Sequence, residues 1–457
     1  MPDSVRVTFQ PEGRAVFVLA GSLLCEAAVK AGITITSPCG GNGTCGKCRV
    51  LVTKGAPPPT EQCSRLVSAE DLARGVRLAC QMHVTQDTVV EIPKESRFYN
   101  QKILTHGVGR EVDLEPDVRK VHVRLPQPSL EDQRADSDRL VEAVQPGARI
   151  PLSVLRGLPG QIRAANGEVT AVVAGDEILS VEPGDTSAAN YGMAFDIGTT
   201  TVVGMLIDLT KGDDLAVAAR TNPQVAHGDD VIARIGFAAT ETGRRLLQSR
   251  IVGCLNEIID ECCATAGIES STIYEITVAG NTTMNHLLLG IQPDYVAQSP
   301  YVAALRDALD TPAAELGIHI HPRGNVHTLP NIAGFVGGDT VGVILATGLL
   351  DADKLTLAID IGTNGEIVAG TKDRLVSCST AAGPAFEGAR IAFGMRAASG
   401  AIDKLVLDGD VRINVIGGQK PRGLCGTAVI DAVAELLRVG IVDSTGRIVP
   451  PGECPAD

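Results

Sequence analysis

The feature that most constrains this chain is a set of four cysteines near its N-terminus. Three stand in the segment SPCGGNGTCGKC and the fourth follows in GVRLACQ; they are Cys39, Cys45, Cys48 and Cys80. A [2Fe–2S] cluster needs four converging thiolates, which one loop and a later strand can supply. The glycines between the cysteines allow a tight loop whose backbone N–H groups approach the cluster sulfurs. The spacing therefore predicts an iron–sulfur site for electron transfer.

A zinc site and four unrelated buried thiols are the alternatives. Zinc sites usually contain two Cys-x-x-Cys pairs or a mixture of cysteine and histidine, whereas only Cys45 and Cys48 form such a pair here. The stretch resembles β-grasp ferredoxins, in particular those with five residues between the first two ligands. This resemblance favours the [2Fe–2S] cluster.

The sequence around the cysteines agrees with a small ferredoxin domain. VRVTF and AVFVL alternate like the two strands of a hairpin, and SLLCEAAVKAG has helical spacing. Ser68 and Asp71 form a capping box for a short helix that ends at Gly75. We therefore expect residues 1–94 to form a complete domain.

The chain has twelve cysteines, but MPDSVRVTFQ is not an apolar, positively flanked signal segment. No run of 18 uninterrupted apolar residues is present, so we expect no membrane span and a cytoplasmic location. Cys25, Cys262 and Cys263 lie on helical patterns and are predicted core residues. Cys63, in KGAPPPTEQCSRL, is predicted to be a spare, oxidisable loop thiol.

The charge and composition restrict the class of partner. A net charge of −14 would repel nucleic acid phosphates and favours a protein partner with a basic docking face. Aromatic residues make up only 3% of the chain, while 50 residues are glycine. Such a profile suits nucleotide-binding α/β domains, in which the backbone approaches its ligand closely.

Residues 95–188 precede the next strong pattern. VRKVHVRL alternates like a strand, and an acidic helix bounded by prolines is predicted to begin near Ser129. A further helix and two hairpin strands are predicted around Ala165, Asn166 and Gly167. We expect a small α+β linker domain that spaces or steers the ferredoxin and has no catalytic role.

A second pattern occurs twice, in YGMAFDIGTTTVVGMLIDL and in LTLAIDIGTNGEIVAG. Each copy is an apolar strand, an Asp-x-Gly-Thr turn and a second apolar strand. The turn allows backbone N–H groups to close on a phosphate, and the aspartate at the strand end holds Mg²⁺ or its water. One copy could be an ordinary sheet turn, but two copies favour a phosphate clamp. The candidate residues are Asp196, Gly198, Thr199, Thr200, Asp360, Gly362, Thr363 and Asn364.

The duplicated pattern resembles the superfamily of acetate and sugar kinases, heat-shock ATPases and actin. This resemblance implies two actin-like (ribonuclease H-like) ATPase halves, residues 189–352 and 353–457, which bind ATP with Mg²⁺ through Asp196 and Asp360. VAGNTTMNHLLLG looks like a strand that feeds a helix at Asn281, which is either a helix cap or a nucleotide contact. GFVGGDTVGVILATGLL looks like the helix connecting the lobes, and its Asp339 is either a water-orienting base or a cap.

The order of ferredoxin, linker and ATPase halves resembles the ATP-dependent reductive activators of corrinoid proteins over nearly the whole chain. TNPQVAHGDDVIARI, AAGPAFEGARIAFGMRA and GLCGTAVIDAVAELL also resemble that family. The resemblance implies that the cluster passes an electron from a low-potential donor to the inactive Co(II) of a corrinoid protein. The Co(I) formed would serve a cobalamin-dependent methyltransferase, and ATP would make the uphill transfer possible. The resemblance is also compatible with a homodimer, and Gly383–Gly400 is our hypothesis for the loop that faces cobalt.

The C-terminal end departs from the superfamily pattern. The superfamily continues into a Gly-Gly adenosine motif and a second connecting helix, whereas this sequence stops at VDSTGRIVPPGECPAD. We therefore expect a truncated second lobe, which puts adenine recognition in question. The alternative function is a [2Fe–2S] electron carrier and docking protein with an ATPase-like domain that does not turn over ATP. A small-molecule kinase fused to a ferredoxin is a third alternative.

Overall fold

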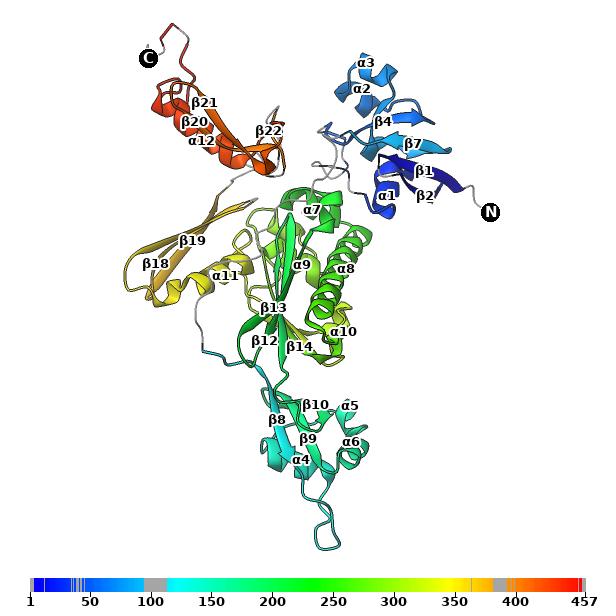
Figure 1. The fold of residues 1–457 in the computed structure, drawn as a ribbon, viewed down its shortest axis with the longest axis vertical. Coiled ribbons are helices and arrows are strands. Elements are labelled where there is room, and N and C mark those ends of the chain that lie inside the picture. Colours follow the sequence, from blue (N-terminus) through cyan, green and yellow to red (C-terminus); the bar gives the residue numbers. More distant parts are fainter. Residues whose placement is uncertain are drawn as a thin grey trace. The chain divides into compact units, whose positions relative to one another are not determined.

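The computed structural model, drawn in Figure 1, describes residues 4–11, 13–33, 35, 37, 41, 43–44, 46–93, 113–362, 364–380, 393–395, 397, 399–450 and 452–453. The chain divides into two units. One contains Met1–Leu104, Pro223–Leu247 and Ala352–Asp457, and the other contains Thr105–Asn222 and Gln248–Asp351. The two predicted phosphate hairpins therefore fall in different units. Among the described residues, no helix combines the length and the apolar character needed to cross a membrane.

The N-terminal residues, blue in Figure 1, form a β-grasp sheet with the strand order β2-β1-β7-β4-β5. The predicted hairpin is confirmed, because β1 and β2 pair antiparallel. The predicted helix cap at Ser68 is confirmed too, since the Ser68 hydroxyl accepts from the Asp71 backbone N–H at 3.1 Å. The strands are β1 (Ser4–Gln10), β2 (Arg14–Leu19), β3 (Ser22–Leu23), β4 (Arg49–Lys54), β5 (Val76–Leu78), β6 (His83–Val84) and β7 (Thr88–Glu91). The helices are α1 (Leu24–Lys30), α2 (Glu61–Leu66), α3 (Ala69–Ala73) and the 3₁₀ turn η1 (Ala79–Gln81).

The linker domain has a three-stranded antiparallel sheet in the order β10-β9-β8. Its apolar core contains Leu140, Ile162 and Ile178, all of which are buried. The central strand β9 is almost entirely buried, as expected for a strand paired on both edges. The elements are β8 (Val118–Arg124), α4 (Asp136–Val144), α5 (Leu152–Leu155), α6 (Leu158–Ala164), β9 (Glu168–Ala174) and β10 (Glu177–Pro183).

Two predictions for this domain are wrong. Helix α4 begins at Asp136 and not near Ser129, because the Ser129 hydroxyl accepts from two following backbone N–H groups, both at 3.2 Å, in a tight turn. The hairpin of β9 and β10 turns at Gly175 and not around Asn166 and Gly167. Asn166 (φ 51°) and Gly167 (φ 83°) instead follow α6, where a left-handed backbone ends the helix.

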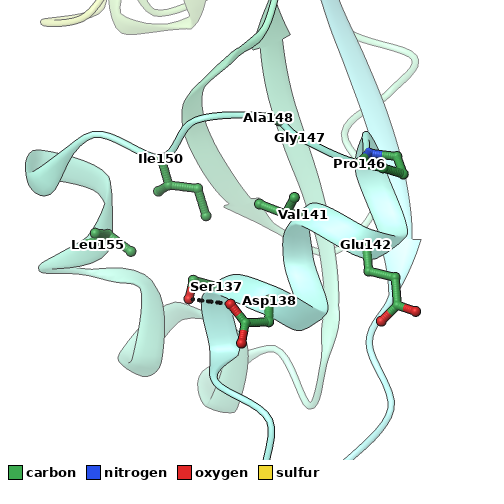
Figure 2. Close-up of a pocket in the computed structure, with 9 residues that line it drawn as sticks. All are labelled: Ser137, Asp138, Val141, Glu142, Pro146, Gly147, Ala148, Ile150 and Leu155. Carbon is green, nitrogen blue, oxygen red and sulfur yellow. Dashed lines mark hydrogen bonds between the residues drawn. The ribbon is translucent and has the colours of Figure 1, made fainter.

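A cavity of about 610 Å³ opens between α4, α5 and the loop that joins them. Figure 2 shows Val141, Ile150 and Leu155 projecting toward the same space, with Asp138 and Glu142 along α4. None of the residues predicted to bind the cluster or the nucleotide lines this cavity.

The linker domain is joined to the following domain by a buried polar network around Glu182. The Lys120 ammonium lies 2.9 Å from the Glu182 carboxylate, and the side chain of Lys120 is 3% exposed. The Tyr274 hydroxyl donates to the same carboxylate at 2.7 Å, and Thr186 donates to it as well. Tyr274 also packs in a small apolar cluster with Val118, Val172 and Leu179. The linker domain therefore packs against the domain that follows it and makes specific polar contacts with it through Tyr274.

This network predicts a specific sensitivity to acid. Burial alone would raise the pKa of Glu182, but the hydrogen bonds from Lys120, Thr186 and Tyr274 outweigh it and hold the pKa below the ordinary value of 4.5. The stabilising contribution is therefore present above pH 4.5 and is lost as the pH falls through the lower pKa of the folded state. Glu182→Gln leaves Lys120 buried without its counter-ion, and we expect a loss of about 3 kcal/mol in the free energy of unfolding at neutral pH.

Denaturant unfolding between neutral and acidic pH tests this expectation. Asp176→Asn is the matched control, since it breaks an ion pair with Arg149 in the same domain whose partners are 68% and 66% exposed. It should cost less than about 1 kcal/mol. Equal losses for the two variants at neutral pH would contradict the role given to the buried network.

The middle domain, green to yellow in Figure 1, is built on a six-stranded sheet in the order β13-β12-β11-β14-β16-β15. Strands β11 and β14 are parallel, and β11 and β12 form the first predicted hairpin. The strands are β11 (Tyr191–Ile197), β12 (Thr201–Asp208), β13 (Asp213–Thr221), β14 (Ile273–Gly280), β15 (Leu309–Pro312) and β16 (Asn325–Thr328). The helices are α7 (Val231–Ala238), α8 (Glu241–Ala266), α9 (Thr282–Leu289), α10 (Ala313–Leu316) and α11 (Gly338–Thr347), of which α7 and the start of α8 fall in the other unit.

The described C-terminal residues form two three-stranded sheets and one long helix. The sheet β17-β18-β19 contains the second predicted hairpin, and helix α12 packs on the sheet β21-β20-β22. The strands are β17 (Thr356–Ile361), β18 (Gly365–Thr371), β19 (Arg374–Thr380), β20 (Ala401–Leu407), β21 (Val411–Val415) and β22 (Gly423–Leu424), and α12 spans Gly426–Arg438.

The two copies of the hairpin differ in how their apolar side chains are covered. In the first copy, Phe195 and Ile197 are 2% and 1% exposed, and Phe195 meets Ile258 of α8 over Gly204, where a Cβ would lie 2.5 Å from each of them. The residues at the same positions of the second copy, Ile359 and Ile361, are 56% and 73% exposed. The described residues thus reproduce the repeated hairpin but not the helix that packs on it.

Candidate functional site

The cluster site is formed by the loop before β4 and by the turn η1. Cys48 directly precedes β4 and Cys80 lies in η1; their side chains are 1% and 4% exposed. The backbone N–H of Ala79 donates to the Cys48 carbonyl at 2.9 Å and brings the two segments together. The two Sγ atoms are 3.3 Å apart, and neither cysteine is in a disulfide. Cys39 and Cys45, the other predicted ligands, lie outside the described residues.

The described part of the site fits an iron–sulfur cluster. Two thiolates on one tetrahedral metal ion, each about 2.3 Å from it, lie roughly 3.8 Å apart, so the sulfurs of Cys48 and Cys80, at 3.3 Å, need to separate by only about 0.5 Å to share one ion. The amide of Gln81 donates to the Cys80 sulfur at 3.7 Å, which is the kind of contact that thiolate ligands receive. Gly41, Gly43 and Gly46 all have positive φ, as predicted for a tightly wrapped loop. No group of three metal-binding side chains occurs within the described ranges, which hold only two of the four predicted ligands.

Two other cysteines lie in the same domain. Burial, together with Glu26 and Cys48, raises the pKa of the Cys25 thiol to about 11, so this group is protonated at neutral pH. The prediction for Cys63 is wrong: it lies in helix α2 and not in a loop, and it is 2% exposed in the ferredoxin core. Thr60 explains the difference, because its hydroxyl accepts from the Cys63 N–H at 3.2 Å and starts a helix directly after the prolines.

The first predicted phosphate hairpin has the expected geometry. The turn between β11 and β12 is closed by the N–H of Gly198, which donates to the Thr201 carbonyl at 2.9 Å. Thr199 is 6% exposed within this turn, and Asp196 is exposed near the end of β11. Asn222, which sequence reasoning missed, is fully buried and donates from its amide to the Gly198 carbonyl at 2.8 Å. Its position directly after β13 in TNPQ was the only signal available.

Asn281 is a helix cap, one of the two roles left open by the sequence, and its role as a nucleotide contact stays a prediction. Its side-chain oxygen accepts from the Met284 N–H at 3.0 Å and caps α9, while its amide nitrogen lies 3.1 Å from the Thr199 hydroxyl. The start of α11 packs against the same place, because a Cβ on Gly337 would lie 2.4 Å from the Thr282 nitrogen. The first hairpin and two helix N-termini therefore meet, and helix N-termini favour anions.

Asp339 stands in the first turn of α11, two residues after Gly337. Its carboxylate accepts from the Thr340 backbone N–H at 2.7 Å, so it contributes to the helix start. The geometry therefore agrees with a helix-starting role and leaves a catalytic one as a prediction.

The second hairpin repeats the closure of the first. The N–H of Gly362 donates to the Asn364 carbonyl at 3.0 Å, and Ile361 pairs with Gly365. Thr363 lies outside the described residues. Partial burial raises the pKa of Asp360 above its ordinary value, which is the effect that a nearby cation would reverse. The cobalt-facing loop proposed at Gly383–Gly400 lies largely outside the described residues.

The two contacts of Asn281, with the start of α9 and with Thr199, give a test that separates folding from nucleotide binding. Asn281→Asp keeps an oxygen that caps α9, so the free energy of unfolding should change by less than about 1 kcal/mol. The added negative charge next to Thr199 should weaken ATP binding by at least about tenfold. Calorimetric titration with ATP and Mg²⁺ measures the affinity. An unchanged affinity for ATP would show that the nucleotide does not bind beside Asn281 and Thr199.

Four family models match the chain in sequence. They describe a 2Fe–2S iron–sulfur cluster binding domain (residues 7–85), the RACo linker region (107–188), the RACo middle region (191–352) and the C-terminal ASKHA domain of RACo (354–455). Together they account for most of the sequence.

Similar proteins span most of this chain. The corrinoid activation enzyme RamQ of Eubacterium limosum is 32% identical over 452 residues, which are 97% of this chain and 72% of RamQ. A solved structure of a reductive activator for corrinoid, iron–sulfur protein has 39% identity and a TM-score of 0.66, and the match covers 97% of this chain and 74% of that one. The [Co(II) methylated amine-specific corrinoid protein] reductase of Methanosarcina barkeri is 28% identical over 293 residues, 56% of this chain and 53% of its own length.

Proposed function

The chain belongs to the RACo family of reductive activators of corrinoid proteins, and from that membership we propose that it reduces the Co(II) of a corrinoid protein to Co(I) in an ATP-dependent reaction. The Co(I) form then supports a cobalamin-dependent methyltransferase. The observation that carries the proposal is the pair of buried thiols of Cys48 and Cys80, 3.3 Å apart, in a chain that also has the linker, middle and ASKHA regions of RACo.

The fold is the predicted combination of a β-grasp [2Fe–2S] ferredoxin, an α+β linker and ATPase-type hairpin halves. When bound, the cluster supplies a one-electron carrier. Cys39, Cys45, Cys48 and Cys80 would hold it, and the buried position of the two described ligands excludes water from one side of the site. The domain boundaries we propose are 1–94, 95–188, 189–352 and 353–457.

ATP is required on energetic grounds. Plant-type clusters have potentials of about −400 mV, and a corrinoid Co(II)/Co(I) couple more negative than this accepts an electron only if its potential is raised. A change of cobalt ligation in the complex achieves this, and nucleotide turnover resets the complex. Asp196, Asp360 and Asp339 are proposed for Mg²⁺ and water. Gly198, Thr199, Thr200, Gly362, Thr363, Asn364 and Asn281 are proposed for the phosphates.

The partners follow from this reaction. The protein needs a low-potential electron donor and the corrinoid protein of a methyltransferase system. We place it in the cytoplasm, a reducing compartment in which the cysteines proposed to hold the cluster stay available as thiolates.

The rate of ATP hydrolysis with and without a Co(II) corrinoid protein tests the proposal. We expect the corrinoid protein in its Co(II) state to stimulate hydrolysis, and the same protein in its methylated state to stimulate it less. A cluster that can be reduced, in a chain that hydrolyses no ATP under either condition, would favour the electron carrier and docking protein instead.

A further inference from the structure

The residue directly after each of the two described cluster ligands folds its side chain back onto the cluster loop. Gln81 follows Cys80, and Arg49 follows Cys48. Gln81 reaches the carbonyl of Gly41, and Arg49 reaches the carbonyl of Gly46. The loop is thus held at two points by side chains whose own backbone positions are fixed next to a ligand.

Gln81 makes the more direct contact with the cluster site. Its amide nitrogen donates to the Gly41 carbonyl at 2.6 Å and lies 3.7 Å from the Cys80 sulfur. The loop packs closely on this side chain, because a Cβ on Gly43 would lie 2.9 Å from the Gln81 amide carbon. A change in Gln81 therefore alters both the hydrogen bonding of a ligand sulfur and the packing of the loop.

Arg49 holds the other end of the loop and brings a positive charge to it. Its guanidinium donates to the Gly46 carbonyl at 3.1 Å and to the Leu66 carbonyl, at the end of α2, at 2.8 Å. Asp71 lies 4.0 Å away, and the Arg49 side chain is 44% exposed. The planar guanidinium spans two carbonyls at once, which the single ammonium of a lysine cannot do with the same geometry.

We propose that Gln81 and Arg49 are positioning residues that set the reduction potential of the [2Fe–2S] cluster and slow its loss. Reduction adds one electron to the cluster and makes or breaks no covalent bond. Hydrogen bonds to ligand sulfurs and a nearby positive charge stabilise the added negative charge, so both residues raise the potential. The inference rests on the cluster of the proposed function and does not depend on ATP or cobalt.

A redox titration of the full chain with dye mediators, followed by EPR of the reduced cluster, tests the potential. Gln81→Leu and Arg49→Gln should each move the midpoint to a more negative value, with the reduction equilibrium falling up to about tenfold, or about 59 mV for one electron. Arg49→Lys keeps the charge but loses the two-point contact. Its potential should stay near the wild-type value, while the cluster is lost faster to an iron chelator.

Two matched variants on α2 control for charge and polarity. Arg65→Gln removes an arginine that is 72% exposed and paired with Glu61, and Gln62→Leu removes an exposed amide. Neither should change the potential or the chelator half-life. If Gln81→Leu fails to assemble a cluster, Gln81→Asn, whose amide is too short to reach both partners, should show the same shift in a milder form.

The proposal is overturned if Gln81→Asn and Arg49→Gln keep both the wild-type potential and the wild-type chelator half-life. It is equally overturned if Arg65→Gln shifts the potential as much as Arg49→Gln does. Because the titration needs no corrinoid protein, these outcomes are separate from failure of the proposed function, which appears only as a lack of Co(II) reduction.

Discussion

Replacing Cys80 by alanine should abolish the cluster and with it all reduction of a corrinoid protein. The Cys80 sulfur lies 3.3 Å from that of Cys48 in a buried site, so its loss removes one of the two thiolates that fit a single iron. No solvent ligand reaches a side chain that is only 4% exposed without rearrangement of η1. We expect the purified Cys80→Ala protein to lack the visible absorption of the cluster and to contain less than half of the wild-type iron and sulfide.

Cys25→Ala is the matched control for this variant. Burial first, and then the nearby Glu26 and Cys48, raise the pKa of the Cys25 thiol to about 11, so Cys25 is not a thiolate at neutral pH. Its replacement should leave iron content, absorption and corrinoid reduction intact. A full cluster in Cys80→Ala, or loss of the cluster in Cys25→Ala, would show that the ligands have been assigned wrongly.

Replacing Asp196 by asparagine should remove the dependence of corrinoid reduction on ATP while leaving the cluster untouched. Asp196 is exposed near the end of β11, beside the turn that Gly198 closes, and belongs to a different unit from the four proposed cluster ligands. Loss of the carboxylate that we propose for Mg²⁺ should lower the ATP-dependent rate by about 10²-fold or more. Iron content and midpoint potential should equal those of the wild type.

Asp213→Asn, at the exposed start of β13 in the same sheet, provides the control and should keep the full rate. Stopped-flow absorbance of the Co(I) product measures both variants. An Asp196→Asn protein with the wild-type rate would remove this hairpin from the nucleotide site and would favour the alternative of a carrier that does not use ATP.

The sequence predicted those features that depend on local chemistry. The glycine-rich cysteine loop, the Ser68 cap and the two Asp-x-Gly-Thr hairpins were all readable, because each is set by neighbouring residues. Local sequence also led to an error, because the start of α4 was predicted near Ser129 from its neighbouring residues alone. Ser129 resembles a helix cap in sequence but forms a separate turn, and Asp136 begins the helix.

The features that sequence reasoning missed depend on contacts between distant segments. Asn222 binds the Gly198 carbonyl across 24 positions in the chain, and Gln81 binds the Gly41 carbonyl across 40. The repeat could predict the second hairpin but not its packing, since the counterparts of the buried Phe195 and Ile197 are exposed. The buried network of Lys120, Glu182 and Tyr274 was likewise invisible, because nothing local distinguishes those residues from surface ones.

The most direct test of ATP-dependent corrinoid reduction is the appearance of Co(I) in an anaerobic mixture of this protein, with its cluster reduced, and a Co(II) corrinoid protein. Absorbance follows the Co(I) with and without ATP and Mg²⁺. We expect Co(I) to accumulate only when ATP is present and Cys80→Ala to abolish its formation. Co(I) formed at the same rate without ATP, or no Co(I) from a protein whose cluster is fully reduced, would contradict this expectation.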